Sequence, residues 1–167
     1  MKRADLEHIL RASKGITCED EFIVLGSQSI LGPHPDAPKE LRMSMEADLY
    51  PKNRPDLSPL IEGALGELSA FHSTFGYYAD GVSPGTATLP ADWEKRLIPL
   101  RTENTGGATG WCLEPHDLAF SKLAARRGRR RRSCRRFFDT SWFDHPGWIT
   151  SSPRSRIQTC ATVSPRR

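Results

Sequence analysis

Residues 22–51, FIVLGSQSILGPHPDAPKELRMSMEADLYP, decide the fold that the sequence predicts. The stretch opens with four apolar residues, 22–25, and an apolar run bounded by turn residues is typical of a central strand with both faces covered. Gly26–Ser27 then forms a turn, and residues 28–31 have room for about one helical turn. Further on, residues 43–50 alternate between apolar and polar side chains, which predicts a second strand with two unlike faces.

The second predicted strand carries Glu46 and Asp48 on its polar side. Residues two apart on a strand point to the same face, so the two carboxylates can share one metal ion. Proteins usually hold Mg²⁺ through one or two carboxylates together with substrate phosphates. A solvated polar face is the alternative, but the Gly26–Ser27 turn upstream presents backbone N–H groups that suit a phosphate. The stretch therefore predicts a nucleotide-phosphate site.

The remaining segments predict a small α+β domain. Helical spacing of apolar residues indicates a first helix over 5–14 and a second from Asp56 or Ser58 to about Phe71. A last helix begins at 114–117, where proline stands at the first helical position, and runs into the arginines that follow residue 125. Short strands are expected at 75–82, 86–89, 96–101 and 111–113. This order of elements predicts a small mixed sheet flanked by helices.

The charge of the chain divides it into two unlike parts. The 167 residues carry a formal charge of +4, but residues 1–125 hold twelve basic and eighteen acidic side chains, a net charge of −6. Residues 126–167 hold twelve arginines, no lysine and two aspartates, a net charge of +10. We therefore expect one acidic domain, 1–125, and an arginine-rich tail, 126–167, which has too few aliphatic residues to form a packed core.

Neither the cysteines nor the apolar segments indicate export or a membrane. The four cysteines show no CxxC spacing and no pattern of metal ligands, as expected of reduced thiols. Apolar runs stay well short of the roughly 20 residues that a membrane-spanning helix needs. The first residues, MKRADLEHIL, lack the apolar segment of a secretory signal. We therefore expect a cytoplasmic protein that does not contact a membrane.

Two motifs together resemble a known family. A strand, Gly-Ser, a short helix and a strand with two acids two apart resemble the polymerase-β type of nucleotidyltransferase fold. More narrowly, they are similar to small bacterial nucleotidyltransferase-like proteins related to the abortive-infection AbiEii type. The family pattern of Gly-Gly or Gly-Ser followed by Asp-x-Asp stands here as Gly26-Ser27 and Glu46-Ala47-Asp48, with Glu for the first Asp. A second signature of the family stands at 114–118 and 122–125, so the resemblance spans about residues 5–125.

The resemblance implies transfer of a nucleoside monophosphate from a nucleoside triphosphate to an acceptor, which the sequence leaves open as protein or RNA. Glu46 and Asp48 would hold Mg²⁺, which bridges triphosphate oxygens and neutralises developing charge. Gly26 and Ser27 would bind the β- and γ-phosphates through backbone N–H groups and the serine hydroxyl. These assignments are expectations from the family pattern.

Three further residues complete the expected site. Gln28 would assist as an amide donor, with an exposed glutamine at the start of a helix as the alternative. Lys122 would reach a phosphate, with a solvated helix lysine as the alternative. Active relatives carry a third carboxylate on a later strand, and the natural strand here, 96–101, contains no acid. Asp80 in YYADGV is the first choice, ahead of Asp92 and Glu94.

The exchange of Asp for Glu at position 46 keeps a second function open. It moves the carboxylate outward by one methylene. Metal binding tolerates this shift more easily than the in-line geometry needed to transfer the nucleoside monophosphate. The alternative function is therefore a catalytically inactive relative that serves as the partner of another protein in a toxin–antitoxin or defence pair.

The arginine-rich tail supports three hypotheses. Arginines among Phe137, Phe138, Trp142 and Trp148 suit a nucleic-acid binder that contacts phosphates and stacks on bases. A disordered basic tail that contacts RNA without sequence preference is a second hypothesis. We favour a third, a frameshift near residue 125. Arginine codons carry G in the second position, so the next frame encodes Gly, Ala, Val, Asp or Glu, as an acidic helix requires.

Overall fold

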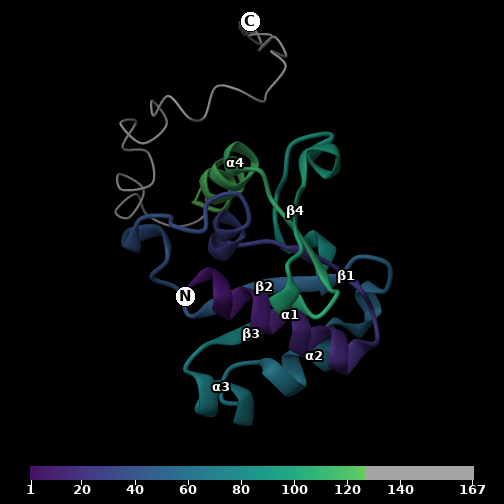
Figure 1. Cartoon of the computed structure of the whole chain (residues 1–167). Helices are drawn as coiled ribbons and strands as arrows, with labels where there is room; N and C mark the ends of the chain where they lie inside the picture. The colour runs from purple at the N-terminus through teal and green to yellow at the C-terminus, as the bar shows by residue number, and fades with distance from the viewer. Residues whose placement is uncertain (127–167) are drawn as a thin grey trace, which may run out of the picture. The chain divides into compact units, whose positions relative to one another are not determined.

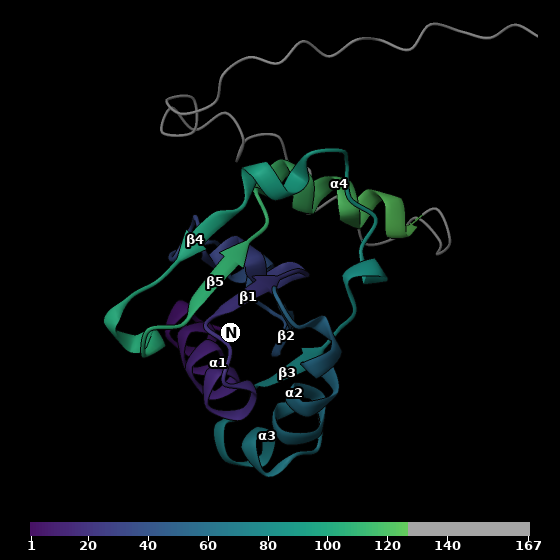
Figure 2. The same ribbon diagram turned by 90° about the vertical axis from the view of Figure 1, so that its right-hand side faces the viewer.

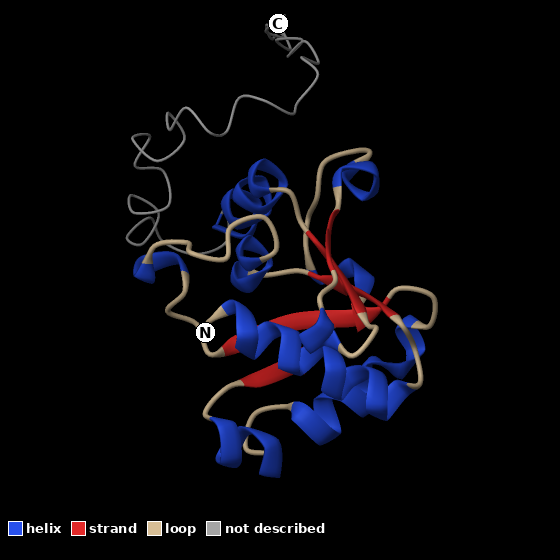
Figure 3. Ribbon diagram, viewed as in Figure 1, coloured by secondary structure: helices blue, strands red, loops and turns tan. Residues whose placement is uncertain are grey.

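The computed structural model describes residues 1–126, which form a five-stranded mixed sheet with helices against it (Figures 1 and 3). The strand order is β3-β2-β1-β5-β4. β1 pairs antiparallel with β2 and parallel with β5, β2 pairs parallel with β3, and β4 pairs antiparallel with β5. The predicted α+β fold is confirmed. The strands are β1 (Glu21–Val24), β2 (Glu46–Pro51), β3 (Tyr78–Gly81), β4 (Ile98–Leu100) and β5 (Thr109–Cys112).

Four α-helices and several short 3₁₀ segments complete the described part. The helices are α1 (Arg3–Thr17), α2 (Ser58–Leu65), α3 (Ala70–Phe75) and α4 (Pro115–Arg126), and the first 3₁₀ segment is η1 (Ser27–Leu31). α1 packs against α2, while α4 lies away from both and contacts η1 (Figures 1 and 2). None of the helices within residues 1–126 has the length and apolar character needed to cross a bilayer.

The core forms between α1 and the central strands. Leu6, Ile9 and Leu10 of α1 follow helical spacing and are completely buried, as is Phe22 of β1. Burying a side chain of this size stabilises a fold by about 1.5–3 kcal/mol. Gly110 on β5 allows Leu10 to approach, because a Cβ at this position would meet the Leu10 methyl groups. The apolar core therefore holds α1 firmly against the central strands of the sheet.

The predicted helix from residue 58 to Phe71 is two helices. α2 ends at Leu65, with Gly66 at its C-terminal cap. α3 begins after Ser69, whose side chain accepts a hydrogen bond from the backbone N–H of His72. Glycine and serine are the usual residues at these ends, so the local sequence carries the break.

Two strand predictions also need correction. β2 begins at Glu46 and not at residue 43, and Met43 and Met45 upstream of it are 74% and 54% exposed. Residues 86–89 do not form a strand in the structure; a short 3₁₀ turn, Pro84–Thr86, stands at the start of this segment instead. Pro84 and Pro90 flank it, and proline has no N–H to donate to a neighbouring strand.

The second family signature, at residues 114–118, contains the contacts that fix the start of α4. The Glu114 carboxylate accepts hydrogen bonds from the backbone N–H groups of His116 at 2.8 Å and Asp117 at 3.3 Å. Buried Asp117 accepts two hydrogen bonds from the Arg96 guanidinium, both at 2.8 Å. These contacts attach α4 to the segment before β4 and so determine where Lys122 stands. The hypotheses about the tail concern residues outside the described part of the chain.

Candidate functional site

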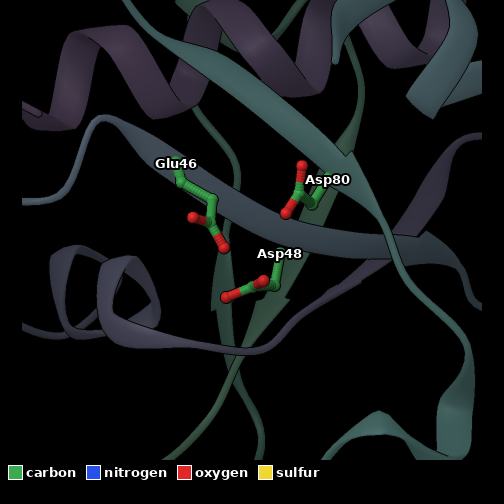
Figure 4. A group of neighbouring side chains, drawn as sticks. All are labelled: Glu46, Asp48 and Asp80. Atoms are coloured by element: carbon green, nitrogen blue, oxygen red, sulfur yellow. The ribbon is translucent and has the colours of Figure 1, made fainter. Parts of the chain in front are cut away.

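Three carboxylates converge where β2 and β3 run side by side. The parallel pairing places Asp48 opposite Asp80 and Glu46 opposite Tyr78. Figure 4 shows Glu46 and Asp48 from β2 and Asp80 from β3 turned toward one another. One oxygen from each of these three side chains lies within 4.8 Å of the other two. The structure thus brings together the two acids predicted from strand alternation and the residue chosen as the third carboxylate.

The electrostatics of this cluster show carboxylates that resist ionisation. Burial raises the pKa of Asp48 to about 6, with a further rise from the hydrogen bond and charge of Glu46. Burial likewise raises the pKa of Asp80 to about 7, with further rises from the charges of Glu46 and Glu62. Like charges close together disfavour the ionised form, and a bound cation reverses that effect.

The donor set fits a hard divalent cation. Mg²⁺ binds oxygen at 2.0–2.1 Å, so two ligands on opposite sides of the ion lie about 4.2 Å apart. Adjacent ligands lie about 3 Å apart, and the three carboxylate oxygens, all within 4.8 Å of one another, stand close to these spacings. Glu46, Asp48 and Asp80 are therefore the described residues that would hold the ion.

The predicted phosphate turn lies directly against this cluster. Gly26 adopts a φ of +61°, and a side chain there would overlap with the Asp48 carboxylate. The Leu25 N–H donates a hydrogen bond of 2.8 Å to the Asp48 carbonyl, which holds the start of the turn against β2. Ser27 is half-buried at the first position of η1. Gly26 therefore stands beside the metal-ligand candidates, and Ser27 follows it directly in the chain.

Gln28 and Lys122 take different positions. Gln28 is completely buried, so the alternative of an exposed glutamine at the start of a helix is wrong. Neither atom of its side-chain amide has a hydrogen-bond partner among the described residues. Lys122 is half-buried on α4, and its charge lowers the pKa of Asp48. The lysine is therefore close enough to act on the charge of the cluster.

The sequence reasoning missed two residues at the site. The Tyr78 hydroxyl donates a hydrogen bond to Glu46 Oε2 at 3.3 Å. Glu62 of α2 accepts a hydrogen bond of 3.0 Å from the Gly81 N–H and adds negative charge beside Asp80. Knowledge of the parallel register between β2 and β3 would have revealed Tyr78, but no local signal in the sequence gives that register.

The other two candidates for the third carboxylate do not join the cluster. Asp92 instead forms an exposed ion pair with Lys95 at 2.8 Å. Glu94 lies in the same short 3₁₀ segment as Lys95 and is not one of the three clustered acids. Asp80 is thus the candidate that the fold places next to Glu46 and Asp48.

Comparisons with known proteins agree with this architecture. A family profile described as "nucleotidyltransferase of unknown function (DUF6036)" matches residues 4–134. Searches of curated proteins and of solved structures each gave no match. The matched region begins one residue inside α1, covers the other strands and helices described above, and continues into the arginine-rich stretch. The chain therefore belongs to this family of nucleotidyltransferases of unknown function.

Proposed function

We propose that the chain binds a nucleoside triphosphate with Mg²⁺ and transfers the nucleoside monophosphate to an acceptor. The observation that carries the proposal is the convergence of Glu46, Asp48 and Asp80 beside the Gly26–Ser27 turn. Membership of the nucleotidyltransferase family supports the same reaction class. The acceptor and the nucleobase stay open, because the site described here selects for phosphate and metal chemistry.

In the proposed reaction an acceptor oxygen forms a bond to the α-phosphorus. The bond from that phosphorus to the oxygen bridging to the β-phosphate breaks, and pyrophosphate leaves with its electron pair. Backbone N–H groups of the Gly26–Ser27 turn and the Ser27 hydroxyl would hold the β- and γ-phosphates, and Lys122 would offset their charge. A bound Mg²⁺ would supply Lewis-acid stabilisation of the phosphate oxygens. Asp80 would position the acceptor hydroxyl, whose proton would pass to the Asp80 carboxylate or to water.

Calorimetry with separate nucleoside triphosphates and Mg²⁺ tests binding. Wild type should bind at least one triphosphate in a metal-dependent way, and the double variant Glu46→Ala plus Asp48→Ala should lose that binding. Glu103→Gln is the matched control, since this exposed acid follows β4, at the sheet edge opposite β3. Triphosphate binding that survives the double change would reject the two-carboxylate site.

Transfer is tested by incubating the protein and a cell extract with each triphosphate labelled at the α-phosphate. Label on a macromolecule, dependent on Glu46 and Asp48, identifies both nucleotide and acceptor. The second candidate function, an inactive relative that acts through a partner protein, is favoured by the glutamate at position 46. It predicts triphosphate or partner binding without label transfer at any metal concentration.

We also propose that the chain is related to AbiEii-type proteins and that its translation is frameshifted from about residue 125. Sequencing the gene tests the frameshift, because the shifted frame should encode amphipathic helices. The competing hypothesis of a nucleic-acid-binding tail requires that deletion of residues 126–167 abolish RNA affinity. RNA affinity that survives the deletion would exclude the tail as its source.

A further inference from the structure

The glutamate at position 46 has a specific partner on the neighbouring strand. The side chain of Glu46 is one methylene longer than the aspartate of the family pattern, so its carboxylate has an additional rotatable bond to fix. The β2–β3 register places Tyr78 directly opposite Glu46. The Tyr78 hydroxyl donates to Glu46 Oε2 at 3.3 Å, and the same carboxylate offers an oxygen within 4.8 Å of oxygens of Asp48 and Asp80.

Tyr78 is itself held in place by α3 and the residues just before it. Its ring lies against the His72 ring, with centroids 4.7 Å apart and planes inclined by 44°. His72 Nδ1 accepts a hydrogen bond from the Leu68 N–H at 3.1 Å, and the backbone N–H of His72 donates to the Ser69 hydroxyl at 3.1 Å. Leu68 adopts a φ of +65°, uncommon for a leucine, to make this contact.

The hydroxyl of Tyr78 is a permanent donor under physiological conditions. An ordinary phenol has a pKa of about 10, so it keeps its proton at neutral pH. The charge of the carboxylate strengthens the contact, whose 3.3 Å is long for an O–H···O hydrogen bond.

We propose that Tyr78 is a positioning residue that fixes the Glu46 carboxylate and so compensates for its additional methylene. The inference rests on the proposed function, because it assigns the Glu46 carboxylate to the metal ion. The outer-sphere partner of a ligating carboxylate orients its oxygen toward the metal, and loss of such a partner typically weakens metal binding 10–100-fold. A shorter aspartate at position 46 would not reach the hydroxyl and would not need it.

A double-mutant cycle on metal affinity tests the proposal. Mn²⁺ binding is measured by calorimetry and by the electron paramagnetic resonance signal of the bound ion. The proteins are the wild type, Tyr78→Phe, Glu46→Asp and the combined variant. Tyr78→Phe should weaken Mn²⁺ binding by about tenfold in the wild-type background. In the Glu46→Asp background the same change should alter affinity by less than about twofold, since the hydroxyl has no carboxylate to hold.

Tyr77→Phe is the matched control. It removes a tyrosine hydroxyl from the adjacent residue, where it bonds His8 Nδ1 at 2.8 Å and has no contact with Glu46. This variant should bind Mn²⁺ as the wild type does. Thermal unfolding without metal shows whether each variant is folded before its affinity is compared.

The outcomes separate the inference from the proposed function. Absence of Mn²⁺ binding to the folded wild type would overturn the metal site and with it the proposed function. Binding to the wild type that Tyr78→Phe leaves unchanged would overturn only the positioning role. Equal losses from Tyr78→Phe in both backgrounds would also overturn it, because the tyrosine would then act on the fold and not on Glu46.

Discussion

Gly26 is the residue at which the phosphate turn and the metal cluster meet. Its φ of +61° with a ψ of −170° belongs to a backbone region that only glycine adopts without strain. A Cβ at this position would also occupy the space of the Asp48 carboxylate. We therefore expect Gly26→Ala to lower the free energy of unfolding by roughly 1–3 kcal/mol and to weaken Mn²⁺ affinity by about tenfold or more.

Chemical denaturation and Mn²⁺ calorimetry measure the two effects of Gly26→Ala. Gly63→Ala is the control, because Gly63 lies within α2 and a Cβ there has no neighbour within 4 Å among the described residues. Alanine at a helical position should stabilise the protein by about 0.5–1 kcal/mol and leave metal affinity unchanged. Wild-type Mn²⁺ affinity in Gly26→Ala would show that Asp48 does not depend on the close approach of the turn.

At the residue scale, the sequence predicts which side chains share a face of one strand better than it predicts which side chains meet across two strands. Alternation along residues 43–50 places Glu46 and Asp48 on one face without any tertiary information. Asp80 reaches them only through the parallel register of β2 and β3, which the chain sets through a connection of about two dozen residues. For the same reason the contact between Tyr78 and Glu46 cannot be predicted from the sequence. The same holds for Gln28, because its burial depends on how η1 packs against distant elements.

The position of α4 depends in part on an ion pair whose carboxylate, Asp117, is buried and whose guanidinium, Arg96, is 40% exposed. Asp117 is 5% exposed and accepts both of its hydrogen bonds from Arg96. Replacement by asparagine leaves the guanidinium with a poorer acceptor. Because the exposed guanidinium is already partly solvated, Asp117→Asn should lower the free energy of unfolding by about 1–2 kcal/mol. Because α4 carries Lys122, triphosphate affinity should fall in the same variant, even though Asp117 is not one of the clustered acids.

Asp92→Asn provides the comparison for Asp117→Asn. It makes the same chemical change in an ion pair whose two side chains are 63% and 79% exposed, where the expected effect is about 0–1 kcal/mol. Denaturation and triphosphate titration of both variants measure the difference. If Asp117→Asn changed stability no more than Asp92→Asn does, the Arg96 contact would not be what holds α4.

Elements were predictable where the chain has strong local signals. β1 is a continuous apolar run, α1 has regular apolar spacing, and α4 begins at a proline, so each appears where the sequence places it. The failures occur where a weak local pattern lacks a partner in the fold. Residues 86–89 alternate well enough for a strand but lie between prolines. Met43 and Met45 alternate with polar residues, yet β2 begins only at Glu46.

For the whole molecule, the three clustered carboxylates make the free energy of unfolding depend on pH and on bound metal. The folded-state pKa values of Asp48, about 6, and Asp80, about 7, both exceed the ordinary aspartate value of about 3.9. Between those values the folded protein binds more protons than the unfolded chain. The free energy of unfolding should therefore decrease as pH rises from about 4 to about 7, with little further change from these groups above about 8.

Divalent metal should reverse this trend, because an ion that binds the ionised cluster stabilises only the folded state. We expect saturating MgCl₂ to raise the midpoint of thermal unfolding by several degrees at pH 8 and to have almost no effect at pH 5.

Scanning calorimetry at both pH values, with and without MgCl₂, measures this for the wild type and for Asp48→Asn plus Asp80→Asn. Other groups titrate in the same range, so the difference between the two proteins carries the prediction. Without metal the double variant should gain stability relative to the wild type as pH rises, and MgCl₂ should cancel that gain by stabilising the wild type alone. An equal response of both proteins to MgCl₂ at pH 8 would contradict a cation held by the aspartates of β2 and β3.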